Sequence, residues 1–315
     1  MEILAWIGVF LISLFVLVKG ADIFTHAAEA VGKSFGVSSF LIGITIVSIG
    51  TSLPELMTSI VAVLQADGLG DTTQIVAANI VGSNIVNIFV AFGLAALLSK
   101  GFNIGRSLVK IDLPLLVGAT GLSILLLMDG KFDWRDGLIS LIGYGIYFAY
   151  IYAQRPVEFN WFKTREELGL KQPLLIILGA IALYFGADWT IRSVMQLADL
   201  LGITQAVITM FAVALGTSLP EIAVSVQAAR QGNAAIAVGN VLGSNMFNLL
   251  VILGLPALFS TLTVSAETIA IGIPFLILST AIFTISTIVP KVSRIEGALY
   301  CLLYITFTAK LFGLI

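Results

Sequence analysis

Long apolar segments, separated by short polar stretches, make up most of this chain. A helix needs about 20 apolar residues to cross a bilayer, and on that measure the pattern predicts ten membrane-spanning helices. Their predicted ranges are Ile3–Val18, Ser38–Leu64, Ile75–Leu98, Ile111–Met128, Leu138–Ala153, Leu174–Ile191, Thr204–Ala228, Ala234–Phe259, Thr268–Ile288 and Ala298–Leu314. The pattern therefore predicts an all-α membrane protein.

The first apolar segment is expected to be a retained helix rather than a cleaved signal sequence. Met1 and Glu2 precede it, whereas a signal sequence carries Lys or Arg there. Ala28 to Ala30 resemble a cleavage site, but Glu29 between them and the missing basic leader argue against cleavage.

One six-residue motif occurs twice. Gly50–Glu55 and Gly216–Glu221 both read Gly-Thr-Ser-Leu-Pro-Glu. Each copy is followed by a second apolar segment that contains Gly-Ser-Asn-x-x-Asn, which ends at Asn87 in the first half and at Asn248 in the second. These matching motifs indicate that the chain is an internal repeat.

A third marker gives the register of the repeat. Gly-Ala-Asp also occurs twice, and 29 positions separate Asp22 from Thr51 as well as Asp188 from Thr217. We therefore divide the chain into a first half, 1–154, a polar linker, 155–172, and a second half, 173–315. Each half has five predicted spans, and since five is odd, the second half should be inserted upside down relative to the first. Inverted repeats with broken helices near mid-membrane are typical of secondary transporters.

Basic residues predict the orientation of the chain, because cytoplasmic loops are enriched in Lys and Arg. With the N-terminus outside, 12 of the 16 Lys and Arg residues fall on the cytoplasmic side. The four on the outer side are Lys131, Arg135, Arg192 and Lys310. We expect a multi-pass protein of the plasma membrane with both termini extracellular and the linker cytoplasmic.

Composition agrees with this class and excludes others. Hydrophobic residues are 58% of the chain and charged residues only 11%, against about 25% charged in soluble domains. The formal net charge of −2 and the lack of a basic stripe argue against nucleic-acid binding. The single cysteine, Cys301, excludes an internal disulfide and a cysteine-based metal cluster.

Glu55 and Glu221 are the acidic residues that fall deep within predicted spans. A charge at the bilayer centre costs on the order of 3 kcal/mol on insertion scales. No Lys or Arg lies at a similar depth in the sequence pattern, so a bound cation is the simplest source of positive charge. The alternative is that both glutamates are protonated and structural.

The prolines beside these glutamates predict broken helices. Pro54 and Pro220 have no N–H and clash with the carbonyl four residues earlier. Polar backbone freed at membrane depth must line protein or a cavity. An ordinary kink is the alternative, but the neighbouring polar side chains favour a site. They are Thr51 and Thr217, four residues before each glutamate and on the same helix face, and the adjacent Ser52 and Ser218.

The second motif places further oxygen ligands on neighbouring helices. Ser83 and Asn87 are four residues apart and share a helix face, as do Ser244 and Asn248. Hydrogen bonding between helices is the alternative role. We weigh that alternative most heavily for the other four asparagines of these segments, Asn79, Asn84, Asn240 and Asn245.

These candidates form a set of oxygen ligands without His or Cys. Ca²⁺ takes six to eight oxygens in flexible geometry, whereas zinc and copper sites are expected to use His or Cys. Two carboxylates can neutralise one Ca²⁺, and Na⁺ would use the same oxygens. A site that either ion can fill, but not both together, suits exchange.

The paired motifs resemble the alpha repeats of the sodium/calcium exchanger family, within the calcium/cation antiporter superfamily. The similarity covers essentially the whole chain and is that of a compact prokaryotic member. It implies that Glu55 and Glu221 hold Ca²⁺ and share Na⁺, and that the first helix of each repeat slides past the remaining bundle. It further implies hydroxyl or carbonyl ligands from Thr51 and Thr217, outer Na⁺ ligands from Ser83 and Ser244, a central ligand from Asn87, and backbone carbonyl ligands from Ser48 and Ala214.

We therefore expect an electrogenic Na⁺/Ca²⁺ antiporter that works by alternating access. Potassium-dependent relatives carry Asp where this chain has Asn248, so the resemblance implies independence of K⁺. Ca²⁺/H⁺ antiport on the same fold and a passive cation channel are the alternatives, and transport of another divalent ion such as Mn²⁺ stays open. The sequence contains no zinc-binding His motif and no intramembrane Asp pair that would indicate an enzyme. No cofactor is expected besides the transported ions. The oligomeric state is open, and a monomer is among the expected states.

The predicted orientation can be tested with epitope tags at residues 1 and 315. We expect both tags to be accessible from outside intact cells, because the excess of basic residues then lies in the cytoplasm. Antibody binding before and after permeabilisation measures this. Tags that are detected only after permeabilisation would contradict the predicted orientation.

Overall fold

The computed structural model describes residues 2–64, 73–99, 101–103, 106–154, 171–200, 215–289 and 291–315, most of them in helices. The α-helices are α1 (Glu2–Ser34), α2 (Ser39–Ile42), α3 (Ser48–Thr51), α4 (Leu53–Leu64), α5 (Thr73–Val86), α6 (Gly93–Leu98), α7 (Arg106–Leu127), α8 (Trp134–Gln154), α10 (Lys171–Leu200), α12 (Leu219–Arg230), α13 (Ala234–Phe247), α14 (Gly254–Ala257), α15 (Ile273–Ile288) and α16 (Arg294–Leu311). Four π-helical segments are η1 (Gly43–Val47), η2 (Asn87–Phe92), η3 (Asn248–Ile252) and η4 (Thr268–Gly272). Four short strands are β1 (Phe102–Asn103), β2 (Lys131–Phe132), β3 (Leu262–Thr263) and β4 (Lys291–Val292).

Two central helical segments form the core. One consists of α5, η2 and α6, the other of α13, η3 and α14, and nearly all of their side chains are buried. Each carries one copy of the Gly-Ser-Asn-x-x-Asn motif. The broken segment α2–η1–α3–α4 and helix α12, which carry the other motif, pack against these two segments. The fold thus brings all four repeated motifs into its interior.

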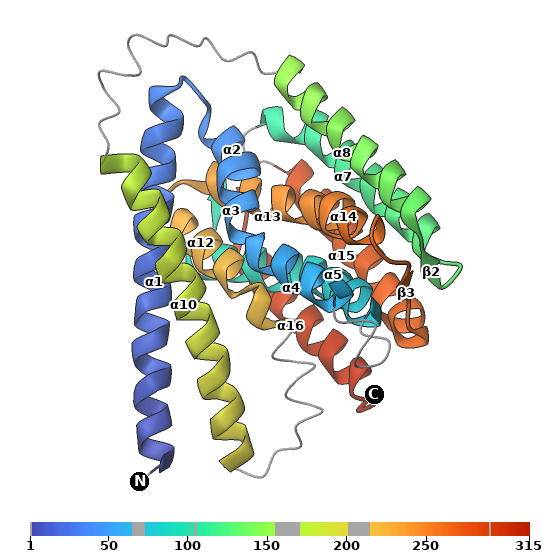
Figure 1. The fold of residues 1–315 in the computed structure, drawn as a ribbon. Helices are drawn as coiled ribbons and strands as arrows, with labels where there is room; N and C mark the ends of the chain where they lie inside the picture. Colours follow the sequence, from blue (N-terminus) through green and yellow to red (C-terminus); the bar gives the residue numbers. More distant parts are fainter. Residues whose placement is uncertain are drawn as a thin grey trace.

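The helices α1 and α10 pack mainly against each other, side by side along the left of Figure 1. They meet through close backbone contacts at glycine. A Cβ at Gly186 would lie 2.6 Å from the backbone nitrogen of Leu17, and one at Gly179 would lie 2.8 Å from that of Phe24. Larger residues at these positions would push the two helices apart.

These two helices are longer than the sequence predicted. The predicted spans ended at Val18 and Ile191, whereas α1 extends to Ser34 and α10 extends from Lys171 to Leu200. The prediction used apolar length alone, but the helices continue through polar residues that find partners. The last two residues of the predicted linker, 171–172, are therefore helical, and the rest of the linker lies outside the described residues.

Short strands connect the two halves of the chain. β1 pairs with β4 through Phe102 opposite Val292, and β2 pairs with β3 through Phe132 opposite Leu262, both antiparallel. β1 follows α6 as β3 follows α14, and β2 follows α7 as β4 follows α15. Exchanging the two halves therefore turns each pairing into the other.

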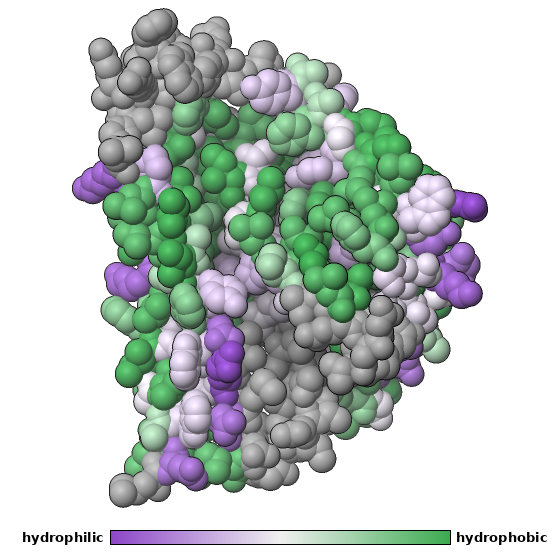
Figure 2. Space-filling model, in the orientation of Figure 1, coloured by the Kyte–Doolittle hydropathy of each residue, from purple (hydrophilic) through white to green (hydrophobic). Residues whose placement is uncertain are grey.

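Six helical segments of the described chain are long and apolar enough to cross a membrane. They are Glu2–Gly32, Ser39–Leu64, Thr73–Leu98, Lys171–Thr190, Ala234–Ala257 and Thr268–Ile288. The face in Figure 2 is mostly apolar among the residues drawn in colour. Leu4, Ile12 and Phe15 of α1 are among the large hydrophobic side chains that the fold leaves exposed, as expected for helices that contact lipid. The predicted span Thr204–Ala228 is described only from residue 215 onward.

Glycines allow α13 to approach the first broken segment closely. A Cβ at Gly239 would lie 2.7 Å from the carbonyl oxygen of Phe40, and one at Gly243 would lie 2.5 Å from Ser48 Oγ and 2.6 Å from the carbonyl oxygen of Ile44. Only a residue without a side chain permits contacts this close at Gly243. The close approach brings the backbone around Ser48 against the central helix.

We predict that Gly243→Ala destabilises the protein by about 1–3 kcal/mol, the usual cost of forcing an added methyl group into a packed interior. Gly118→Ala in α7 is the matched control, because a Cβ there meets nothing within 4 Å. Replacing glycine in a helix by alanine should stabilise by about 0.5–1 kcal/mol. Thermal unfolding of purified protein in detergent measures both effects, and equal stability of the two variants would contradict the close packing at Gly243.

Candidate cation-binding site

Glu55 and Glu221 converge in the interior although 166 positions separate them in the chain. Both side chains are fully buried, and they are close enough to repel each other electrostatically. Ser52 Oγ donates a hydrogen bond of 2.7 Å to Glu221 Oε1, so the motif of one half directly contacts the carboxylate of the other. The fold thus brings the two glutamates into one buried region.

The helix is interrupted beside each proline, as the sequence predicted. Ser52 and Ser218 have nearly identical non-helical torsion angles, with φ of −88° and −87° and ψ of 4° and 3°. A new helix begins at the next residue in each half, so Pro54 and Pro220 occupy its first turn, where the missing N–H costs nothing. Both glutamates also lie in that first turn, and the helix dipole stabilises negative charge there.

The two repeated threonines reach across to the central helices. Thr51 Oγ1 lies 3.2 Å from the carbonyl oxygen of Ser48 and 3.3 Å from Asn240 Oδ1. Thr217 Oγ1 lies 3.4 Å from Asn79 Oδ1 and 3.4 Å from Ser83 Oγ. Thr51 is also a neighbour of Glu221, and Thr217 is a neighbour of Glu55. Each threonine thus lies beside the carboxylate of the opposite half.

Asn87 and Asn248 each occupy the first position of a π-helical segment, η2 and η3. Such segments are frequent at functional sites because they disturb the regular backbone bonding of the helix. Both side chains are fully buried, and neither amide has a hydrogen-bond partner among the described residues. In η3 the carbonyl of Leu249 accepts a hydrogen bond of 3.3 Å from Ser123 Oγ of α7.

Two of the remaining predicted ligands, Ser244 and Ser48, lie beside each other. Ser244 Oγ is 3.5 Å from the carbonyl oxygen of Ser48. The Ser48 hydroxyl donates to Ile44 O at 2.8 Å, so its backbone carbonyl is the group that faces Thr51 and Ser244. Ala214 lies outside the described residues.

Several buried oxygens have no hydrogen-bond partner among the described residues. They are Glu55 Oε1 and Oε2, Glu221 Oε2, Ser218 Oγ, Asn87 Oδ1 and Asn248 Oδ1. Burial of polar groups without a partner is costly, most of all for charged groups. The described residues contain no group of three or more His, Cys, Asp or Glu side chains that could hold a metal. A cation here would therefore depend on hydroxyl, amide and backbone oxygens as well as on the two carboxylates, which suits hard ions.

Other acidic residues differ from the sequence prediction. Asp112 of α7 is also fully buried, although it stood at the edge of a predicted span. Asp22, which follows the predicted first span Ile3–Val18, lies within α1 and accepts hydrogen bonds of 2.8 and 2.7 Å from Gln227 and Gln231. Local sequence gives no signal for partners this far apart in the chain.

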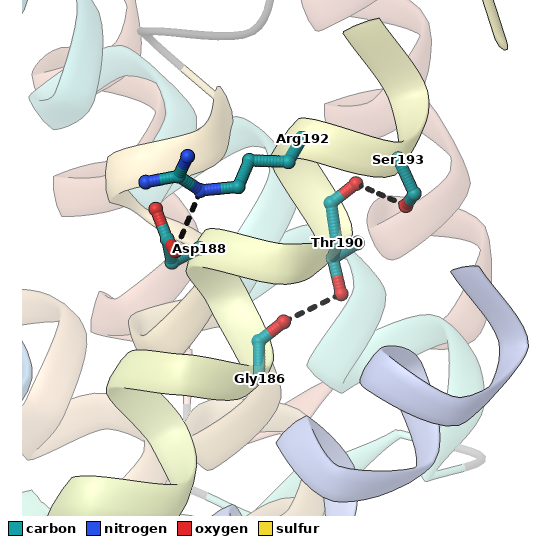
Figure 3. Close-up of polar contacts among 5 residues, drawn as sticks. All are labelled: Gly186, Asp188, Thr190, Arg192 and Ser193. Carbon is teal, nitrogen blue, oxygen red and sulfur yellow. Dashed lines mark hydrogen bonds and ion pairs between the residues drawn. The ribbon is translucent and has the colours of Figure 1, made fainter. Parts of the chain in front are cut away.

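Asp188 likewise lies within α10 rather than at its end. Its Oδ2 accepts a hydrogen bond of 2.8 Å from Arg192 Nε one helical turn later (Figure 3). Thr190 Oγ1 in the same view donates to the Gly186 carbonyl at 2.7 Å, and it also lies 3.0 Å from Ser13 Oγ of α1. These contacts satisfy polar groups within the α1–α10 pair, which is why the two helices continue past their polar residues.

Comparison with known proteins decides the family. The model of the sodium/calcium exchanger protein family matches residues 5–153 and 171–313. The chain belongs to this family. Exchangers are transporters rather than enzymes, and the chain is accordingly a multi-pass membrane protein of the cation exchanger class.

Individual sodium/calcium exchangers match over nearly their whole length. The chain is 33% identical to the sodium/calcium exchanger MaX1 of Methanosarcina acetivorans, over 96% of this chain and 97% of the relative. A solved structure of the sodium-calcium exchanger NCX_Mj superimposes with a TM-score of 0.85 at 30% identity, over 98% of this chain and 99% of that chain. The sodium/potassium/calcium exchanger 4 of Mus musculus is 31% identical, but over only 42% of this chain and 21% of the relative.

We predict that Asn248→Leu raises stability in cation-free buffer by about 1–3 kcal/mol, because it removes a buried amide that lacks hydrogen bonds. Asn240→Leu should instead lower stability, because the Asn240 amide donates to Ser225 Oγ at 2.9 Å and to the Glu221 carbonyl at 3.3 Å. Thermal unfolding with a chelator and without Na⁺ compares the two. A loss of stability in both variants would contradict the assignment of Asn248 as unpartnered.

Proposed function

We propose that the protein is a Na⁺/Ca²⁺ antiporter that exchanges the two ions by alternating access at one buried site. The observation that carries the proposal is the convergence of Glu55 and Glu221, both fully buried. No Lys or Arg of the described chain forms an ion pair with either carboxylate. Two adjacent buried negative charges need positive charge, and a transported cation supplies it.

The proposed ligands are the oxygens that surround the two carboxylates. Glu55 and Glu221 would hold Ca²⁺ and share Na⁺. The other proposed ligands are the side chains of Thr51, Thr217, Ser52, Ser218, Ser83, Asn87, Ser244 and Asn248, with the backbone carbonyls of Ser48 and Ala214. The unpartnered oxygens of Asn87, Asn248 and Ser218 support this set, because binding of a cation would satisfy them.

Charge balance supports exchange of the two ions. With Asn at both Asn87 and Asn248, the site has two acids, which neutralise one Ca²⁺. Two Na⁺ would do the same, and a third would leave a net positive charge. We propose electrogenic exchange of three Na⁺ for one Ca²⁺ on the family pattern. Structures of NCX_Mj soaked with Na⁺, with Ca²⁺ and with Sr²⁺ support binding of these ions by that relative.

The proposed topology is ten spans in two inverted five-helix halves, 1–154 and 173–315, joined by the cytoplasmic linker 155–172. The reciprocal pairing of β1 with β4 and of β2 with β3 supports a two-fold relation between the halves. The excess of basic residues supports a plasma-membrane protein with extracellular termini. Alternating access would move the α1–α10 pair, because it packs mainly against itself.

The alternatives are a Ca²⁺/H⁺ antiporter on the same fold and, from another class, a passive cation channel. A Ca²⁺/H⁺ antiporter would load protons on the two carboxylates instead of Na⁺, and a passive channel would need no counter-ion. Potassium-dependent relatives carry Asp where this chain has Asn248, which supports independence of K⁺. Mn²⁺ could fill the same all-oxygen site.

We predict that vesicles loaded with Na⁺ take up Ca²⁺, and that Glu55→Gln or Glu221→Gln reduces this uptake to background. Each substitution removes one of the two charges that balance Ca²⁺. Glu267→Gln is the matched control, because Glu267 is exposed and precedes η4 away from the carboxylates. Radioactive Ca²⁺ uptake with purified protein in liposomes measures exchange, and undiminished uptake in either site variant would reject the proposed site.

Separate gradients distinguish the alternatives in the same liposomes. Uptake that follows the Na⁺ gradient and generates a membrane potential supports electrogenic Na⁺/Ca²⁺ exchange. Uptake driven by a pH gradient without Na⁺ would support Ca²⁺/H⁺ antiport. Flux that needs no counter-ion gradient would support a channel. A requirement for K⁺ would contradict the K⁺ independence that we propose from Asn248.

A further inference from the structure

The asparagine Asn240 of α13 contacts both copies of the Gly-Thr-Ser-Leu-Pro-Glu motif. Its Oδ1 accepts a hydrogen bond of 3.3 Å from Thr51 Oγ1 at the end of α3. Its Nδ2 donates to the carbonyl of Glu221 at 3.3 Å and to Ser225 Oγ at 2.9 Å, both in α12. The side chain is fully buried. A single amide therefore fixes the relative position of Thr51 and the helical turn that carries Glu221.

The chemistry of the amide decides where the threonine proton points. Asn240 Oδ1 can only accept, so Thr51 must be the donor in this hydrogen bond. A hydroxyl has one proton and two lone pairs. With its proton directed at Asn240, Thr51 keeps its lone pairs available for a cation.

The alternative acceptors explain why this matters. The Ser48 carbonyl lies 3.2 Å from Thr51 Oγ1 and also accepts from the Ser52 backbone N–H at 3.1 Å. The Glu221 carboxylate is another neighbour of Thr51. Both groups are proposed cation ligands, so without Asn240 the Thr51 proton would occupy a lone pair that a cation needs.

The other half contains the same contact in a looser form. Thr217 Oγ1 donates to Asn79 Oδ1 at 3.4 Å, but Asn79 Nδ2 has no hydrogen-bond partner among the described residues. Ser59, which corresponds to Ser225 in the repeat, is buried, and its hydroxyl likewise has none. The asparagine of the second half is thus held in place more firmly than that of the first.

We propose that Asn240, and more weakly Asn79, are positioning residues that set the direction of the threonine hydroxyls toward the transported ions. This inference rests on the proposed binding site. It assigns these asparagines a role in ion affinity that acts through Thr51 and Thr217, beyond ordinary hydrogen bonding between helices.

A double-mutant cycle tests the proposal through equilibrium binding of Ca²⁺ and Na⁺ to the purified protein, independently of transport. We expect Asn240→Leu to weaken Ca²⁺ binding about three- to tenfold, the range for loss of one hydrogen bond. Thr51→Val should weaken it similarly. The double variant should bind no more weakly than Thr51→Val alone, because the asparagine acts through that hydroxyl.

A second cycle and a control variant make the outcome decisive. Asn79→Leu with Thr217→Val repeats the cycle with a smaller expected effect, and this pair carries the test if Asn240→Leu does not fold. Asn233→Leu is the control, because this half-buried residue precedes α13 and its side chain makes no cap hydrogen bond. Unchanged Ca²⁺ affinity in Asn240→Leu and Asn79→Leu would overturn the proposal. So would double variants in which the fold-losses of affinity of the two single variants multiply.

The same measurements separate this inference from the proposed function. Normal Ca²⁺ binding without Na⁺-driven exchange in liposomes would reject the antiporter, while a non-multiplicative cycle would still support the role of Asn240. Wild-type protein that binds neither Ca²⁺ nor Na⁺ would overturn both.

Discussion

Two carboxyl groups held together in a buried interior are the constraint on which this structure depends. Glu55 and Glu221 come from opposite halves of the chain, and both are fully buried. Hydrogen bonds satisfy them only in part, since a serine donates to one oxygen of Glu221 and the oxygens of Glu55 have no hydrogen-bond partner among the described residues. A fold that keeps such a pair must fix the position of each carboxyl group and must balance any charge that the pair carries.

A few local features of the backbone around the two glutamates meet these requirements. The helix breaks at Ser52 and Ser218 place each glutamate in the first turn of a new helix, where the dipole favours negative charge. Glycines such as Gly243 let the backbone of one segment approach the next closely. Two of the π-helical segments, η2 and η3, begin at the buried Asn87 and Asn248. Each feature would be a defect in an ordinary helix, and their coincidence in both halves indicates a functional site.

Much of this could be predicted from the sequence, because apolar length, proline and repetition are local signals. The breaks before Pro54 and Pro220 and the burial of both glutamates followed from them. The extent of α1 did not, because Asp22 is tolerated inside a helix only through glutamines more than 200 positions away. The contact between Thr51 and Asn240 spans 189 positions and depends on how the halves pack. Sequence reasoning could name Asn240 as polar but could not choose its partner.

The two small strand pairs have a mechanical consequence. Each one fastens a loop of the first half to a loop of the second, so the halves cannot separate without breaking backbone hydrogen bonds at two places. The inner bundle should therefore resist distortion. The helices α1 and α10 are held instead by glycine contacts that let one backbone run directly against the other. On the proposed mechanism, this outer pair would be the part that moves against a rigid frame.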